Sequence, residues 1–173
     1  MHAQKLVDKA KAASERKAHD LAIELYLQAL ALEPDHREAR EGIRTVELKK
    51  FEAYYPSKLT RSLGSIGARL AGWFAGITKN NEKKMIACER ILAGDPKNAA
   101  VGLKLGEAAV AAGYKNAAAA AFGGVLLSNP DNAAALKGLG RMLAQLGEPR
   151  EALKAFEQAL AIDRVLLTRR ELD

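Results

Sequence analysis

The chain has 173 residues, of which 49% are hydrophobic, 28% charged and 5% aromatic, with a formal net charge of +6. This composition excludes an intrinsically disordered chain and is typical of a folded one. The single cysteine, Cys88, excludes an intrachain disulfide and fits a reducing compartment. No stretch reaches the roughly 20 apolar residues of a transmembrane helix, and the charged N-terminus has no apolar signal segment. We therefore expect a cytoplasmic protein.

The predicted elements are all helices. Apolar residues recur every three or four positions, alanine is frequent, and the breaks fall at proline, glycine and asparagine. In chain order the predicted helices span residues 3–18, 20–33, 35–55, 58–78, 82–94, 98–112, 115–128, 132–146 and 149–162. The sequence thus predicts an all-α fold of about nine helices without a sheet.

The predicted helix 58–78 combines two patterns. Its large apolar residues step by three or four, as on one face of an amphipathic helix. A second row, Gly64, Ala68, Gly72 and Gly76, has a small residue at every fourth position and would let another helix lie very close. Residues 44–84 hold nine basic and three acidic residues, so the formal net charge of the chain is concentrated there, together with five of the nine aromatic residues.

A basic and aromatic patch in this region is a candidate contact surface. Its members are Lys58, Arg61, Arg69, Trp73, Phe74 and Lys79. One interpretation is ordinary packing inside the fold with the charges in solvent. The other is contact with an acidic protein or, peripherally, with an anionic membrane. No sequence motif for reading nucleic acid accompanies the charge, so we do not expect a nucleic-acid partner.

A fixed period runs through the second half of the chain. The interval from Pro96 to Pro130 equals the interval from Pro130 to Arg164, so that Arg164 stands in the position of a third proline. A period of this length, about 34 residues, predicts stacked helical hairpins, each covering the apolar face of its neighbour.

The same residue types recur inside this period. Small residues are expected where two helices cross closely, large residues beside them, and Gly113 and Gly147 at the end of the first helix of each pair. The small residues are Gly106, Ala118, Gly140, Ala152 and Ala159, and the large ones are Phe122, Leu139, Leu143 and Phe156. This pattern resembles the tetratricopeptide repeat, closely over residues 99–164, moderately over 3–34 and loosely over 65–98.

The resemblance implies a right-handed superhelical solenoid of antiparallel helix hairpins. The expected organisation is an N-terminal hairpin plus an extra helix in 1–55, a divergent basic and amphipathic hairpin in 56–98, two well-matched units in 99–164, and a tail in 165–173.

The resemblance also implies a groove, lined by the first helix of each hairpin, that takes a peptide from a partner protein. The matching positions are Leu103, Glu107, Val110, Lys137, Arg141 and Gln145. Lys137 and Arg141 are one helical turn apart and are positioned to meet a carboxylate, whereas Glu107 opposes an acidic ligand. The predicted groove is mixed in charge and mostly apolar.

Residues for chemistry are not grouped in this sequence. The three histidines are scattered, and none stands at metal-ligand spacing from another or from Cys88. The glycines of residues 64–76 follow no strand and so fail the test for a phosphate-binding loop. We therefore expect no catalytic residue, no metal and no cofactor, and a protein that is not an enzyme.

The C-terminal tail is a candidate association surface. Because Arg164 replaces the helix-breaking proline, the last helix is free to run past residue 162. The apolar cluster of Val165, Leu166 and Leu167 either folds back as a cap or pairs with another chain. Two functions stay open: an adaptor that binds proteins through the groove or the basic helix, and a structural subunit that self-assembles or lies on a membrane through 58–78 and the tail.

Overall fold

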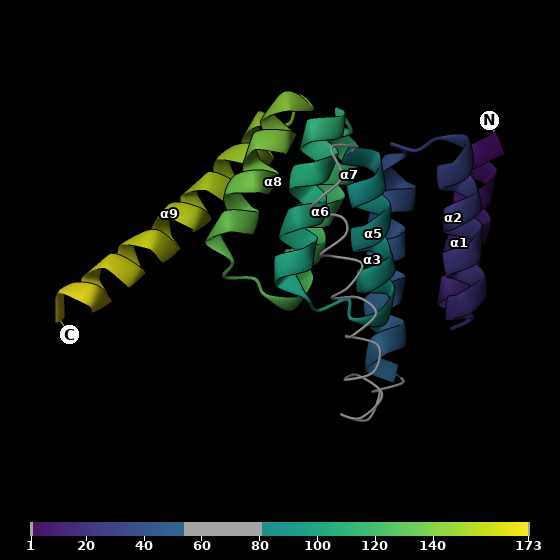
Figure 1. The fold of residues 1–173 in the computed structure, drawn as a ribbon, viewed down its shortest axis with the longest axis horizontal. Helices are drawn as coiled ribbons and strands as arrows, with labels where there is room; N and C mark the ends of the chain where they lie inside the picture. Colours follow the sequence, from purple (N-terminus) through teal and green to yellow (C-terminus); the bar gives the residue numbers. More distant parts are fainter. Residues whose placement is uncertain (1, 54–80, 173) are drawn as a thin grey trace.

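The computed structural model describes the backbone of residues 2–53 and 81–172, and the side chains of the same ranges as far as Val165. This part of the chain is helical throughout and contains no strand, which confirms the all-α prediction (Figure 1). The helices are α1 (His2–Glu15), α2 (His19–Leu32), α3 (Arg37–Ala53), α5 (Asn81–Gly94), α6 (Ala99–Ala112), α7 (Lys115–Ser128), α8 (Ala133–Gln145) and α9 (Pro149–Leu172). The predicted helix 58–78 lies outside the described residues.

Successive helices pack against one another as antiparallel hairpins. The pairs α1–α2, α6–α7 and α8–α9 form hairpins, and α3, α6 and α8 pack against the helix that precedes each of them among those described. In Figure 1 the helices stand in a row from α1 and α2 at one end to α8 and α9 at the other. The predicted fold of consecutive helical hairpins is therefore confirmed.

Two glycines end the first helices of the C-terminal hairpins, as predicted. Gly113 and Gly147 both have φ +82°, the left-handed conformation that glycine adopts without steric cost. Two boundaries differ from the predictions. Helix α1 ends at Glu15 rather than near residue 18 because Lys17 is left-handed at φ 60°. Helix α9 continues to Leu172, past the boundary predicted at residue 162, because Arg164 stands where a helix-breaking proline would end it.

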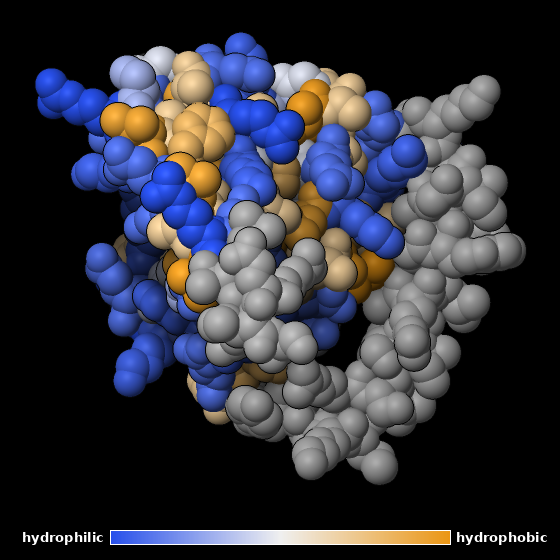
Figure 2. Space-filling view, turned by 90° about the vertical axis from the view of Figure 1, so that its left-hand side faces the viewer, coloured by the Kyte–Doolittle hydropathy of each residue, from blue (hydrophilic) through white to orange (hydrophobic). Residues whose placement is uncertain are grey.

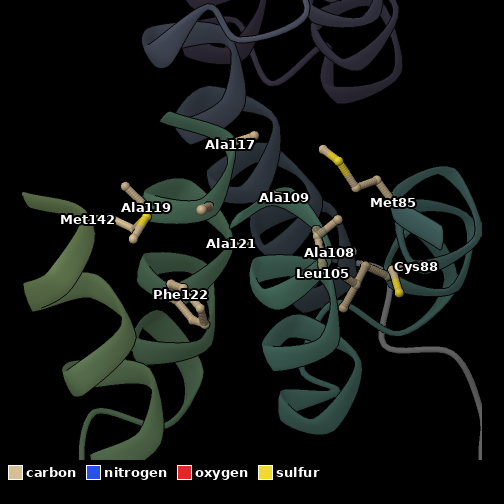
Figure 3. Close-up of a cluster of buried hydrophobic side chains, with 12 residues drawn as sticks. Met85, Cys88, Leu105, Ala108, Ala109, Ala117, Ala119, Ala121, Phe122 and Met142 are labelled. Atoms are coloured by element: carbon tan, nitrogen blue, oxygen red, sulfur yellow. The ribbon is translucent and has the colours of Figure 1, made fainter. Parts of the chain in front are cut away.

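Two hydrophobic clusters hold the helices together. One joins α1, α2 and α3, and the other joins α5, α6, α7 and α8 (Figure 3). Cys88 is a buried member of the second cluster, where burial raises the pKa of its thiol. This confirms its packing role. Met85, Leu105, Phe122 and Met142 supply the bulk of the cluster, and alanines let the helices approach closely.

Helix α3 departs from a simple linear stack. It packs against α2 on one side and against α7 on the other, although α3 and α7 are far apart in the sequence. Helix α7 is thus enclosed by α3, α6 and α8. This enclosure explains why residues 116–130 carry no charged side chain, because a helix covered on several sides has little surface left for solvent.

Candidate protein-binding surfaces

The predicted groove residues lie on the exposed faces of α6 and α8. These two helices contact each other, and residues one repeat period apart in the sequence take equivalent places on them. Five of the six predicted residues are solvent-exposed, and the sixth, Leu103, is half-buried against the core. The exposed five are Glu107, Val110, Lys137, Arg141 and Gln145. The opposite faces of both helices are buried.

The two basic residues of this face are not equally available. Lys137 Nζ lies 2.7 Å from Oδ2 of Asp163 in α9, so its charge already has a carboxylate partner within the chain. Arg141 forms no ion pair among the described residues, and its Nε donates to the carbonyl oxygen of Lys137 at 3.4 Å. An acidic group of a ligand would therefore meet Arg141 first.

A second surface, which the sequence did not predict, is a cleft of about 330 Å³ between α3, α7, α8 and the start of α9. Its floor consists of small residues of α7, among them Ala119, Ala120 and Gly123, with Leu127 57% exposed at the edge. The cleft exists because α3 reaches α7. The sequence does contain one sign of this cleft, the adjacent Gly123 and Gly124 within the uncharged residues 116–130.

An ion pair closes one edge of this cleft. The Arg37 guanidinium binds both carboxylate oxygens of Glu148, in the turn before α9, and its Nε also donates to Glu41 at 2.9 Å. The hydrogen bonds from Arg37 hold the pKa of Glu148 below its usual value, and the two carboxylates raise the pKa of Arg37.

The start of α7 is capped by a residue that lies far from it in the sequence. Asp35, just before α3, accepts hydrogen bonds from the backbone N–H groups of Asn116 and Ala117, at 3.3 and 2.8 Å. Tyr114, at the local cap position of α7, makes no such side-chain bond. In contrast, α8 is capped locally, since Asn132 accepts from the N–H of Ala135 at 2.9 Å.

Charged side chains fasten α3 to α5. Glu89 of α5 lies 3.1 Å from Arg40 and also pairs with Arg44, which in turn pairs with Glu47 at 2.8 Å. Arg44 and Glu47 are both buried, and burial lowers the pKa of the first and raises that of the second. Both residues belong to the basic region 44–84, and helical periodicity does not reveal that an arginine is covered from outside its own hairpin.

The aromatic residues of the second helices mark the interfaces between repeats. The Phe122 ring of α7 contacts Gly106 of its own hairpin and Gly138 of the next one, and Phe122 is 5% exposed. Phe156 of α9 occupies the equivalent position and contacts Gly140 of its own hairpin, yet it is 37% exposed. The difference arises because no described helix follows α9.

The other predicted sites fall partly outside the described region. The basic and aromatic patch, Lys58, Arg61, Arg69, Trp73, Phe74 and Lys79, lies outside it, as do the side chains of Leu166 and Leu167. Val165 is 65% exposed. Within the described residues, no three His, Cys, Asp or Glu side chains converge to hold a metal, and no helix is both long and apolar enough to cross a membrane.

Comparison with known proteins agrees with the repeat pattern. Residues 103–164 match the family model described as tetratricopeptide repeat. A crystal structure of MamA is 17% identical, with 96% of this chain and 81% of that chain covered and a TM-score of 0.50. A structure of MamA AMB-1 is 15% identical over 94% of this chain and 92% of that chain, with a TM-score of 0.52. No curated protein matches significantly in sequence.

At such identities the MamA structures are evidence for the fold alone. The family model covers the two C-terminal hairpins, where small residues, aromatic residues and helix-ending glycines recur with the repeat period. Residues 103–164 of the chain therefore carry the tetratricopeptide-repeat signature, within an all-helical fold similar to that of MamA.

Proposed function

We propose that this chain is a non-enzymatic scaffold that holds a segment of a partner protein across the exposed faces of α6 and α8. The tetratricopeptide fold is one that suggests protein–protein interaction. The observation that carries the proposal is the pair of adjacent first helices whose free faces combine an apolar side chain, Val110, with an arginine, Arg141, that has no ion-pair partner among the described residues.

The chemistry of this face defines the kind of peptide that would bind. Val110 is 45% exposed and would gain from covering by an apolar side chain. Arg141 would pair with an acidic side chain or a terminal carboxylate. Glu107, at the equivalent place on α6, disfavours a second acidic group close by. The expected ligand is therefore a mainly apolar peptide with one acidic residue.

Peptide display against the full-length chain tests this proposal. Selected peptides should be apolar with one acidic position, and the variants Arg141→Glu and Val110→Glu should each lose most of the binding. Lys9→Glu, an exposed charge reversal on α1, is the matched control and should bind as the unaltered chain does. If the peptides bind Arg141→Glu and Val110→Glu with unchanged affinity, the α6–α8 face is not the site.

The basic and aromatic patch remains a separate proposal of partner or membrane contact, for a protein that we place in the cytoplasm or at the membrane periphery. Reversing Arg61, Arg69 and Lys79 to Glu should abolish co-sedimentation with vesicles of an anionic phospholipid at low salt, since each basic residue near such a surface contributes about 1 kcal/mol. If neither the unaltered chain nor the variant sediments with the vesicles, the membrane alternative is wrong.

A further inference from the structure

The cleft between α3, α7, α8 and the start of α9 lies apart from the α6–α8 face proposed above as the peptide site. Its volume of about 330 Å³ is at the lower end of the range typical of binding pockets. Its floor is one face of α7, from Ala119 to Leu127, which measures about 12 Å along the helix axis. Leu139 and Leu143 of α8 also line it, so its surface is mainly apolar.

Gly123 stands at the centre of this floor, and no neighbouring atom of the chain requires a glycine there. The adjacent Gly124 is explained by α3, because a Cβ atom at that position would lie 3.2 Å from the Arg44 side chain. A Cβ atom at Gly123 would meet no atom within 4 Å. Glycine inside a helix is less favourable than alanine. Gly123 therefore weakens α7 without a packing gain inside the chain, and a backbone that approaches α7 from the cleft would account for it.

The charged residues around the cleft leave a negative charge available. The lining holds three carboxylates and two guanidinium groups, those of Glu41, Glu148, Glu151, Arg37 and Arg44. Arg37 is bound by Glu41 and Glu148. Arg44 pairs with two carboxylates that lie outside the lining. Glu151 is exposed and forms no ion pair among the described residues, so a cationic group of a ligand would find its carboxylate free at the start of α9.

We propose that this cleft binds an amphipathic helix of a partner protein, with apolar side chains and one lysine or arginine on its inner face. The apolar side chains would cover Leu127, which is 57% exposed, with the backbone close to Gly123 and the cation paired with Glu151. A helix fits because α3 already lies against the adjoining part of α7, so the partner would extend the same layer. The required charge is opposite to that expected for the peptide on the α6–α8 face, so this is a second, independent site.

The cleft is set apart from the exposed apolar residues of α9. Figure 2 shows the end of the molecule formed by α8 and α9, where hydrophobic side chains in orange lie among hydrophilic ones in blue. Leu153 and Phe156 of α9 are exposed but do not line the cleft. The exposed Glu157 follows Phe156 directly and does not line the cleft either. Comparing Glu151 with Glu157 therefore distinguishes the cleft from this neighbouring surface.

Fluorescence anisotropy with synthetic peptides and the full-length chain tests the site. The probes are short alanine-based helical peptides with two leucines one turn apart and one lysine, whose place along the helix is varied across the set. At least one member should bind. Its counterpart with glutamate in place of the lysine should bind about tenfold more weakly, because the cleft then meets it with like charge.

Three charge variants locate the bound peptide. Glu151→Lys should weaken binding of the lysine peptide by about tenfold and improve binding of the glutamate peptide. Glu157→Lys makes the same charge change on α9 outside the cleft and is the matched control, which should leave the affinity nearly unchanged. Arg141→Glu on the α6–α8 face should also leave it unchanged, so failure of this site and failure of the proposed function are distinguishable.

Gly123→Ala separates a binding role from a structural one. It should raise the midpoint of thermal unfolding of the free chain and yet weaken binding of the lysine peptide several-fold, because the added methyl group occupies the floor of the cleft. Unchanged affinity of Gly123→Ala overturns the proposal. So do a peptide set that does not bind, equal binding of the lysine and glutamate peptides, and a loss of binding in Glu157→Lys or Arg141→Glu but not in Glu151→Lys.

Discussion

Helices α7 and α9 hold equivalent places in successive repeats, yet their surroundings differ. Helix α7 is packed against α3, α6 and α8, whereas α9 packs against α8. Phe122 and Phe156 have the same chemistry and the same glycine contact within their own hairpins, but their exposed fractions are 5% and 37%. The burial of a repeat position is therefore decided by the neighbouring helix and not by the residue type.

The residue types nevertheless follow this difference. Where α3 covers α7, the chain has Ala119, and at the equivalent position of α9 it has Leu153, which is 58% exposed. A helix that faced only solvent there would gain nothing from a leucine. The contrast between the closed α7 and the open α9 leads to five predictions, each of which would sharpen or break it.

The largest expected effect is truncation of the enclosed ring. We expect Phe122→Ala to cost about 3–5 kcal/mol in the free energy of unfolding, because it leaves a cavity between two hairpins that cannot collapse freely. Phe156→Ala should cost about 1–2 kcal/mol, since one wall of its site is open to solvent. Urea unfolding of both variants measures the difference, and equal costs would contradict the contrast.

Enlarging the facing glycines should give the next largest difference. A Cβ atom at Gly138 would lie 2.8 Å from the Phe122 ring, and one at Gly140 would lie 2.8 Å from the Phe156 ring. Gly138→Leu should cost about 3 kcal/mol because Phe122 cannot move aside, and Gly140→Leu about 1 kcal/mol because Phe156 can turn into solvent. Thermal melts of the two variants compare them. A larger loss of stability for Gly140→Leu than for Gly138→Leu would show that Phe156 is enclosed as tightly as Phe122.

Weakening the ion pairs between α3 and α5 should loosen the cover that α3 provides for α7. The surroundings of α7 should then become more like those of α9. Glu89→Gln leaves Arg40 and Arg44 next to each other without their shared carboxylate. We expect a loss of about 2 kcal/mol in unfolding free energy, because Arg44 is buried. Glu107→Gln, on the exposed face of α6, is the control and should change little. Unfolding by urea separates the two.

Removing the long-range cap of α7 is expected to cost about 1 kcal/mol. Asp35→Ala deletes the acceptor of the Asn116 and Ala117 N–H groups, and Asn132→Ala deletes the local cap of α8. Both should therefore destabilise the protein to a similar extent. If Asn132→Ala is destabilising and Asp35→Ala is neutral, α3 does not dock on α7 in solution.

The smallest expected effect is on the stability of the protein at acid pH. The pKa of Glu148 is lowered from about 4.5 by Arg37, so the ionised carboxylate stabilises the folded state above that pH, and the contribution is lost as the pH falls through the folded-state pKa. Glu148→Gln should lower stability by less than about 1 kcal/mol at neutral pH, since the pair is partly exposed. In strong acid the two proteins should unfold alike. A difference that persists there would not come from this ion pair.

The repeats were predictable from the sequence because they depend on local rules. The repeat period, the glycines that end α6 and α8, and the extension of α9 past Arg164 each follow from a few neighbouring residues. The docking of α3 was not predictable in this way. Its contacts join Asp35 to Asn116 and Arg40 to Glu89, residues far apart in the sequence that show no shared period. The uncharged run of residues 116–130 indicated only that something covers α7.

The groove and the open end were predictable to different degrees. The resemblance to the family placed Glu107, Val110, Arg141 and Gln145 on exposed helix faces, but it did not reveal that Lys137 is paired with Asp163. At the C-terminus the sequence drew attention to Val165, Leu166 and Leu167. The larger exposed stripe, Leu153, Phe156 and Leu160, lies one to three turns earlier, at positions whose equivalents in α2 and α7 are buried or half-buried.

The bond between Asp35 and the start of α7 has a consequence for how the chain folds. Repeat proteins commonly fold from any point outward, since each unit interacts only with its neighbours. Here the first turn of α7 receives its cap from a residue 81 positions upstream, so an intermediate with only the C-terminal hairpins formed lacks that bond. Closing so long a loop slows folding and makes the C-terminal hairpins depend on the N-terminal part of the chain. We therefore expect the N-terminal and C-terminal hairpins to unfold in one cooperative transition, unlike units that peel away singly.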